Sequence, residues 1–461
     1  MSKPIVRLGV APTKRGFLSM EEAKRQKDWF MAVIRAVKPE SIHIVDIDDI
    51  CENGILFETE KILPVVEKFR DARIDALFLP HCDFGEEQCA AGVAAALQIP
   101  TLMWGPRDER PNTDQSRGRD TQCGMFACTK VLRRFGVTYS YIWNCETESQ
   151  DFRQGFLRFI QTAAVVKTVR SLRIAKFGAR PQPFMSVMAN EGDLATRLGV
   201  TVVPISPHAV AARADRLQTE APKVYCDYRE ELRARFDVSR TPGETVDRIA
   251  ALRLAVEELM AENRCAAGAM ECWSAASVFG APVCTVLGEL GDAGLPLACE
   301  TDVNGAVTMA MLHAATLGEE PVFLADLTIR HPENDNAELL WHCGPFPYSL
   351  KDPMSAAGLA EGQERFFLKK GEITLCRFDE AGGEYYLFGG EGRAVDGPET
   401  TGTYVWFEAD NWKRWEEKLM FGPYIHHVGG VYGNYKPVLR EAARYLGLTF
   451  DDADQQGIYS L

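Results

Sequence analysis

The sequence predicts an α/β protein in which two doubly wound parallel-sheet domains precede an antiparallel, β-barrel-like domain. Strand-like and helix-like runs alternate over residues 1–168, and the alternation repeats over 169–328. Alternation of this kind favours a parallel sheet with helices on both faces. After Asp326 the helical periodicity fades, and short alternating runs with Gly and Pro follow over 329–461. We therefore expect three domains with these boundaries.

The first domain is expected to contain five strands separated by helices. Each predicted strand is a short apolar run, and helix-like stretches with apolar residues at three- to four-residue spacing lie between them. The predicted strands are Ile5–Val10, Ser41–Ile47, Asp75–Pro80, Pro100–Trp104 and Val137–Ile142, and the predicted helices include Met20–Val37, Glu58–Arg73 and Glu86–Leu97.

The second domain repeats this pattern from Leu172 onward. Its longest helix is predicted over Glu244–Cys265, where the apolar residues keep roughly helical spacing. Its predicted strands are Leu172–Lys176, Thr201–Ile205, Ala267–Trp273, Pro296–Glu300 and Pro321–Asp326.

The short alternating runs of the third domain predict an antiparallel barrel or sandwich. One closing helix is predicted over about Pro437–Leu446. The predicted strands are short and include Phe366–Leu368, Glu372–Phe378, Glu384–Phe388 and Thr403–Glu408.

Composition excludes several classes of function. A net charge of -14 over 461 residues argues against a nucleic-acid surface, which needs a basic patch. The 13 cysteines form no CxxC pair, which is typical of reduced thiols in the cytoplasm. No apolar run reaches the ~18 residues of a transmembrane helix, so no membrane partner is expected. The phosphate-loop, dinucleotide, GxSxG and HExxH motifs are absent as well.

Carboxylates gather at the ends of three predicted strands of the second domain. They are Glu271, the pair Glu300 and Asp302, and Asp326. Ligands of open parallel sheets bind at the carboxyl ends of strands, and carboxylates packed there repel one another unless a cation is shared. The pattern therefore predicts a divalent ion such as Mn²⁺. The alternative for Asp302 is that it caps a helix beginning near Asn304.

Two further clusters carry polar groups. His426 and His427 lie in a glycine-rich segment, and because adjacent side chains point apart, at most one is expected to bind the metal. The alternative is an ordinary polar loop. Lys14 and Arg15 follow the first strand and are candidates for contacting an oxyanion, with a solvated loop as the alternative. Arg107 also follows a strand of the first domain.

Together these stretches resemble the L-fucose/L-arabinose isomerase superfamily, closest to its fucose-isomerase-like branch. The resemblance spans most of the chain in the same order. Its motifs are Pro12-Thr13-Lys14-Arg15-Gly16, Glu271-Cys272-Trp273, Cys299-Glu300-Thr301-Asp302-Val303-Asn304-Gly305-Ala306, Phe323-Leu324-Ala325-Asp326, and His426-His427 through Tyr432-Gly433-Asn434.

The resemblance implies two α/β domains and a barrel-like third, a homo-oligomer that is commonly a hexamer, and Mn²⁺-dependent aldose–ketose isomerisation. Asp302 and His427 match the metal-binding positions, and Glu300 is the next candidate. The sequence departs from the fucose enzymes where they carry a metal-binding, proton-transferring Glu, because Cys284 aligns there. Glu271 is expected to supply that carboxylate, with Glu289 as a weaker candidate.

The resulting hypothesis is a ketol-isomerase that moves hydrogen between C1 and C2 of an open-chain sugar. Glu271 and Asp302 are the expected proton-handling residues, with Glu300 as the alternative to Asp302. The expected ligands of Mn²⁺ or another divalent ion are Glu271, Glu300, Asp302 and His427. The expected substrate contacts are Lys14, Arg15, Trp104, Arg107, Trp406 and His426. A deoxyhexose or pentose is the first expectation for the sugar, and a sulfonated hexose such as sulfoquinovose is the alternative. A non-catalytic sugar-binding protein on an isomerase scaffold is the alternative of another class.

Overall fold

The structure, a computed structural model, describes residues 3–111, 113, 115 and 117–457. Contacts between Cα atoms divide the chain into an N-terminal unit, Lys3–Lys167, and a C-terminal unit that begins at Thr168. The further division of the C-terminal unit at residue 328 stays a prediction. Within the described residues no helix is both long and apolar enough to cross a bilayer.

The N-terminal unit is built on a five-stranded, wholly parallel sheet in the order β2-β1-β3-β4-β5. This confirms the predicted alternation, because every strand is followed by a helix. The strands are β1 (Val6–Val10), β2 (Ile42–Val45), β3 (Ala76–Pro80), β4 (Thr101–Trp104) and β5 (Tyr139–Tyr141), and the helices are α1 (Met20–Arg35), α2 (Ile62–Asp71), α3 (Glu87–Leu97), α4 (Thr121–Arg134) and α5 (Gln150–Arg170).

The C-terminal unit begins with a second parallel sheet, in the order β10-β9-β6-β7. Its strands are β6 (Arg173–Phe177), β7 (Thr201–Ile205), β9 (Ala267–Met270) and β10 (Leu297–Ala298), and the helices around it are α6 (Glu191–Asp193), α7 (Pro207–Glu220), α8 (Pro222–Arg235), α9 (Gly243–Glu262), α10 (Ala275–Phe279), α11 (Cys284–Asp292) and α12 (Val303–Ala315).

A ten-stranded mixed, largely antiparallel sheet completes the C-terminal unit. Its order is β19-β16-β15-β18-β11-β12-β17-β14-β13-β8, and pairing of β16 with β17 closes six of the strands into a ring, which confirms the barrel-like expectation. The elements are β8 (Asp237–Arg240), β11 (Phe323–Arg330), β12 (Ala337–His342), β13 (Gly358–Ala360), β14 (Gln363–Phe367), β15 (Glu372–Ala381), β16 (Glu384–Val395), β17 (Thr403–Ala409), α13 (Trp412–Phe421), β18 (His427–Tyr432), α14 (Lys436–Leu446) and β19 (Thr449–Asp452).

One predicted strand joins a different sheet from the one expected. Residues 321–326 are predicted in the second parallel sheet, whereas β11 pairs antiparallel with β12 and β18. The first residues of β11 are buried. A short apolar run of this kind shows that a strand is covered but does not reveal its partners. The consequence for the site is large, since the pairing sets Asp326 directly opposite His427.

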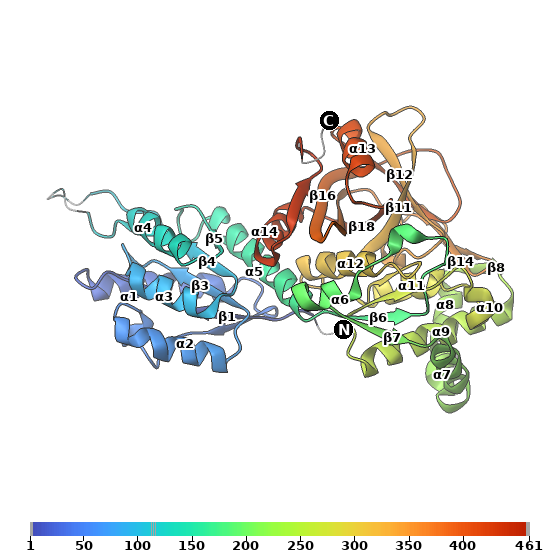
Figure 1. Cartoon of the computed structure of the whole chain (residues 1–461), viewed down its shortest axis with the longest axis horizontal. Helices are drawn as coiled ribbons and strands as arrows, with labels where there is room; N and C mark the ends of the chain where they lie inside the picture. The colour runs from blue at the N-terminus through green and yellow to red at the C-terminus, as the bar shows by residue number, and fades with distance from the viewer. Residues whose placement is uncertain (1–2, 112, 114, 116, 458–461) are drawn as a thin grey trace. The chain divides into compact units, whose positions relative to one another are not determined.

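Helix α12 lies between the parallel sheet and the ring, in contact with β9 on one side and with β15 and β18 on the other (Figure 1). Nearly all of its residues are buried, as expected for a helix that is apolar all round. Two glycines of β18 allow this packing. A Cβ on Gly429 would lie 2.8 Å from Thr308 of α12, and one on Gly430 would lie 2.2 Å from the ring of Phe323.

Candidate metal centre and active site

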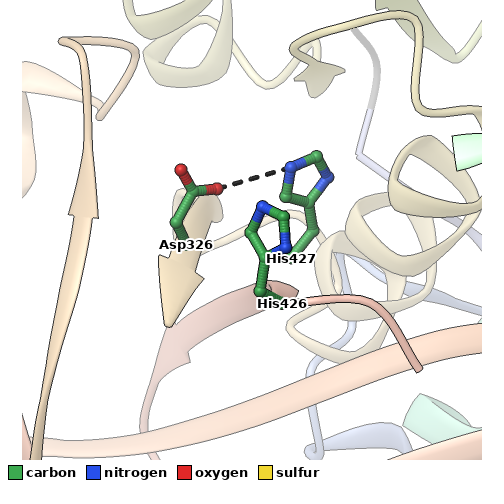
Figure 2. Close-up of side chains that lie close together, drawn as sticks. All are labelled: Asp326, His426 and His427. Carbon is green, nitrogen blue, oxygen red and sulfur yellow. Dashed lines mark ion pairs between the residues drawn. The ribbon is translucent and has the colours of Figure 1, made fainter. Parts of the chain in front are cut away.

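The two cross-strand partners Asp326 and His427 form the base of the candidate site. The Nε2 atom of His427 lies 3.4 Å from Oδ1 of Asp326. Figure 2 shows this carboxylate and ring facing each other, with the ring of His426 beside them. One potential ligand atom from each of these three residues lies within 4.8 Å of the other two. Of the three, His427 is buried, Asp326 half-buried and His426 exposed.

Glu300 reaches the same imidazole from the turn after β10. Glu300 and Thr301 both adopt left-handed backbone conformations, with φ of 59° and 58°. Non-glycine residues rarely do so, and such strain of about 1–3 kcal/mol each is concentrated at functional sites. The turn leaves Oε2 of Glu300 3.0 Å from Nε2 of His427, while Oε1 accepts a 2.8 Å hydrogen bond from the indole of Trp273.

Asp302 holds His427 from the opposite side. Oδ2 of Asp302 lies 2.8 Å from Nδ1 of His427, and Oδ1 accepts the backbone N–H of Gly305 as the N-cap of α12. The guanidinium of Arg377 binds both oxygens of Asp302 and also pairs with Asp379. Asp302 and Arg377 have no exposed side-chain surface. The capping alternative for Asp302 is thus realised, together with a contact to the histidine.

Electrostatics fix the orientation of the His427 ring. Burial alone would raise the pKa of Asp302, but the charge of Arg377 and the hydrogen bond with His427 outweigh burial and hold this pKa well below its usual range. An ionised carboxylate only accepts hydrogen bonds, so Nδ1 of His427 donates the proton. Nε2 is therefore directed toward Glu300 and Asp326.

Several buried side-chain nitrogen and oxygen atoms lie close together around His427. Oδ1 of Asp326 and Nε2 of His342 are buried and make no hydrogen bond within the described residues, whereas the buried Nε2 of His427 lies 3.0 Å from Oε2 of Glu300. Burial alone would lower the pKa of His427, but Asp302, Glu300 and Asp326 raise it to about 9. Two carboxylates facing one oriented imidazole nitrogen form a donor set that suits a hard divalent ion. A carboxylate behind the other nitrogen is the usual support of a metal-binding histidine.

An aromatic loop lies against this group. We call residues 178–188, which follow β6, the Phe184 loop. The ring of Phe184 stacks on Trp273 at 5.7 Å and on His426 at 5.9 Å, and meets His427 edge-on at 5.5 Å between centroids. No motif in the sequence predicts this loop as part of the site.

Glu271 lies at the end of β9, next to Trp273. Its side chain is largely buried, and Oε1 accepts a 2.7 Å hydrogen bond from the backbone N–H of Ser274. Glu271 lines a cavity with Trp273 and the Phe184 loop. The catalytic and metal-binding roles expected for it stay predictions. Glu289, the weaker candidate, is buried elsewhere in the unit, where the Tyr228 hydroxyl donates a 2.5 Å hydrogen bond to it and Arg235 pairs with it.

Four cysteines that the sequence leaves scattered come together beside the site. The Sγ atoms of Cys272 and Cys299 are 3.1 Å apart, and those of Cys284 and Cys343 are 3.3 Å apart. All are free thiols. In the chain, Cys272 follows Glu271, Cys299 precedes Glu300 and Cys343 follows His342.

Lys14 and Arg15, two of the other predicted substrate contacts, bind partners within the N-terminal unit. Lys14 donates to the carbonyls of Arg15 and Gly16, and Arg15 pairs with Glu86 at 3.0 Å. These residues, with Trp104 and Arg107, belong to the N-terminal unit.

The two predicted tryptophans lie in hydrophobic surroundings. Trp104 is fully buried against Phe30 and Phe152. Trp406 of β17 is buried, and its indole donates to the carbonyl of Pro398. Substrate contact by either residue stays a prediction.

Two family models match the chain. The N-terminal domain of fucose/sulfoquinovose isomerase matches residues 9–170, and the C-terminal domain of L-fucose isomerase matches residues 357–453. The chain is therefore an isomerase of sugars. It belongs to the fucose/sulfoquinovose isomerase family, as the resemblance indicates.

Three relatives of this chain are named sulfoquinovose isomerase, which is more specific than the name of the family. The sulfoquinovose isomerase of Priestia aryabhattai is 25% identical over 409 residues, which cover 87% of this chain and 90% of the relative. That of Alkalicoccus urumqiensis is 28% identical over 337 residues, covering 70% and 73%. That of Clostridium sp. (strain MSTE9) is 25% identical over 434 residues, covering 91% and 93%.

Proposed function

We propose that the protein is a metal-dependent ketol-isomerase of a sulfonated hexose of the sulfoquinovose type. The observation that carries the metal-dependent part is the buried Nε2 of His427, which faces the carboxylates of Glu300 at 3.0 Å and Asp326 at 3.4 Å. The names of the relatives support the sulfonated substrate, and they favour it over a neutral deoxyhexose or pentose, which is the first expectation from the sequence.

In this proposal Glu300, Asp326 and His427 hold the ion, Mn²⁺ or another divalent cation, and His426 lies at the open side. The bound ion would act as a Lewis acid toward the C1 and C2 oxygens of the open-chain sugar. Asp302 acts as a positioning residue, because both of its oxygens are already engaged by Arg377, Gly305 and His427. Direct coordination by Asp302 remains the alternative assignment.

Glu271 is our candidate for proton transfer. It is a carboxylate in the cavity that Trp273 shares with the Phe184 loop, and Trp273 touches Glu300. In the proposed reaction Glu271 takes the proton from C2, which leaves an enediolate, and returns it to C1, while the C2 hydroxyl proton passes to the C1 oxygen and C2 becomes the carbonyl carbon. Its hydrogen bond from Ser274 fixes the direction of the carboxylate.

The test is turnover after metal removal and Mn²⁺ add-back. Sulfoquinovose, L-fucose, L-arabinose and D-quinovose would be offered, with ketose formation and deuterium uptake at C2 followed by NMR. Ion-dependent exchange on sulfoquinovose is the expected result. Exchange only on a neutral sugar would contradict the substrate proposal, and tight ion binding without exchange on any sugar would favour the non-catalytic scaffold.

A further inference from the structure

A cavity of about 410 Å³ lies beside the aromatic group, between the Phe184 loop and the segment after β9. Its walls include Arg180 and Gln182 of the loop, and Glu271, Trp273 and Val278 on the other side. The indole of Trp273 connects this cavity to Glu300, and through Glu300 to His427. A sugar held at the metal centre would therefore have this cavity within reach for its far end.

We propose that Arg180 is the residue that recognises the anionic tail of the substrate, the sulfonate at C6. This inference rests on the proposed function and adds a specificity-determining residue to it.

The Phe184 loop is anchored to the site at three points. At its start Gly178 has a φ of 91°, and a Cβ there would come within 3.0 Å of the Glu271 side chain. The next residue, Ala179, accepts a 3.2 Å hydrogen bond from the hydroxyl of Thr301, the neighbour of Glu300. Further on, Phe184 packs on the histidines. Arg180 lies between the second and third anchors, so its position is fixed relative to the site.

The charge of Arg180 is uncompensated in the described part of the chain. Its Nη1 donates to the carbonyls of Pro181 and Gln182, both at 3.0 Å, and no carboxylate lies within ion-pair distance of the guanidinium. Arg377, by contrast, is neutralised by Asp302 and Asp379. The two carbonyl contacts occupy one nitrogen and hold the planar group, while the other N–H donors remain for a ligand. A guanidinium presents parallel donors that match the oxygens of an anionic group.

The opposite wall of the cavity suits the rest of a sulfonated hexose. Trp273 is 56% exposed, although its indole nitrogen donates to Glu300 and its ring stacks on Phe184. The part of this fixed aromatic ring that Phe184 leaves exposed is suited to the C–H face of a sugar ring. Glu271 is the one carboxylate among the residues that line this cavity, and it would repel an anion close to it. The pair Glu271 and Arg180 therefore defines a reacting end and a sulfonate end.

The test compares two sugars that differ only in the sulfonate, sulfoquinovose and D-quinovose, in the wild type and in Arg180→Gln. For sulfoquinovose, KM in the variant should rise roughly tenfold to a hundredfold, the size expected for loss of a charge-assisted pair, with little change in kcat. For D-quinovose, KM should not change. Arg180→Lys keeps the positive charge but loses the paired N–H donors of the guanidinium, so its KM for sulfoquinovose should lie between those of the wild type and Arg180→Gln. Arg197→Gln, which removes an arginine outside this cavity, is the matched control and should behave as wild type.

A merely structural role of Arg180 would raise KM for both sugars equally and would overturn the inference. Unchanged KM for sulfoquinovose in Arg180→Gln would overturn it as well, while leaving the isomerase proposal intact. Calorimetric binding of sulfoquinovose separates the remaining cases. Binding that depends on Arg180 without turnover would support Arg180 and contradict the proposed reaction, and wild-type protein that neither binds nor converts sulfoquinovose would overturn both.

Discussion

Replacing Asp302 by Asn should weaken metal binding without abolishing it. The substitution keeps the shape of the side chain, but the amide cannot accept from Arg377, Gly305 and His427 together, and the imidazole loses the carboxylate that fixes its orientation. Loss of such a supporting carboxylate typically lowers metal affinity 10- to 100-fold, or about 1.4–2.8 kcal/mol. Because Arg377 would keep only Asp379 as a charged partner, we also expect a loss of stability of about 3 kcal/mol.

The matched control is Asp379→Asn. Like Asp302, Asp379 pairs with Arg377, here at 2.9 Å, but its oxygens otherwise accept from Asn304 and the backbone of Glu380 rather than contacting His427. It should therefore lower the free energy of unfolding while leaving Mn²⁺ affinity near the wild-type value. Mn²⁺ titration by electron paramagnetic resonance and urea unfolding measure the two quantities separately. Equal Mn²⁺ affinity in Asp302→Asn and wild type would refute the positioning role, and equal weakening in both variants would show that the effect comes through stability alone.

Three further results are expected. His427→Ala should lose bound Mn²⁺ and turnover together while its circular dichroism stays native, and a variant that retains stoichiometric Mn²⁺ would rule out His427 as a ligand. Burial lowers the pKa of His81 to about 4, from about 6.5 in an unfolded chain, so the unfolded state binds more protons between these values. The contribution of His81 to the free energy of unfolding should be fully present above pH 6.5 and should fall toward pH 4 by up to about 1.4 kcal/mol per pH unit. His81→Asn should make the free energy of urea unfolding less dependent on pH in this range; an equally steep dependence in the variant would assign it to other groups. Glutathione disulfide should link Cys272 to Cys299 by thiol–disulfide exchange, releasing two molecules of glutathione, removing two free thiols and slowing turnover. Cys272→Ser should protect the enzyme, and unchanged turnover after the loss of both thiols would separate this pair from the site.

Local patterns in the sequence are sufficient to predict the layers of this fold. The alternation of strands and helices identifies both parallel sheets, because a crossover helix leaves its own periodic signature. The change after Asp326 from helical periodicity to short alternating runs likewise indicates the antiparallel ring. Strand partners are a different matter. The apolar run of β11 shows that the strand is buried, but the run would look the same in either sheet.

The candidate site could be predicted only in part for the same reason. Carboxylates at strand ends and a histidine in a glycine-rich segment are local signals, and they lead to Glu300, Asp302 and His427. The pairing of Asp326 with His427 depends on strand register, and the partnership of Arg377 with Asp302 joins residues 75 positions apart. No local pattern encodes such contacts. No sequence motif surrounds Arg180. Its proposed role in sulfonate recognition can be inferred only from the packing of the Phe184 loop on Trp273.

The register of β18 has a consequence for the order in which the protein matures. His427 meets Asp302 across 125 residues, and it enters the site on one of the last strands of the chain. During synthesis the carboxylates therefore emerge long before the imidazole that completes the set. A nascent chain that has not yet exposed β18 lacks the nitrogen donor, so in the proposed site an ion would bind only after β18 has joined the ring. Because ion binding stabilises only the state that contains the site, a bound metal would stabilise the protein only after the ring has folded.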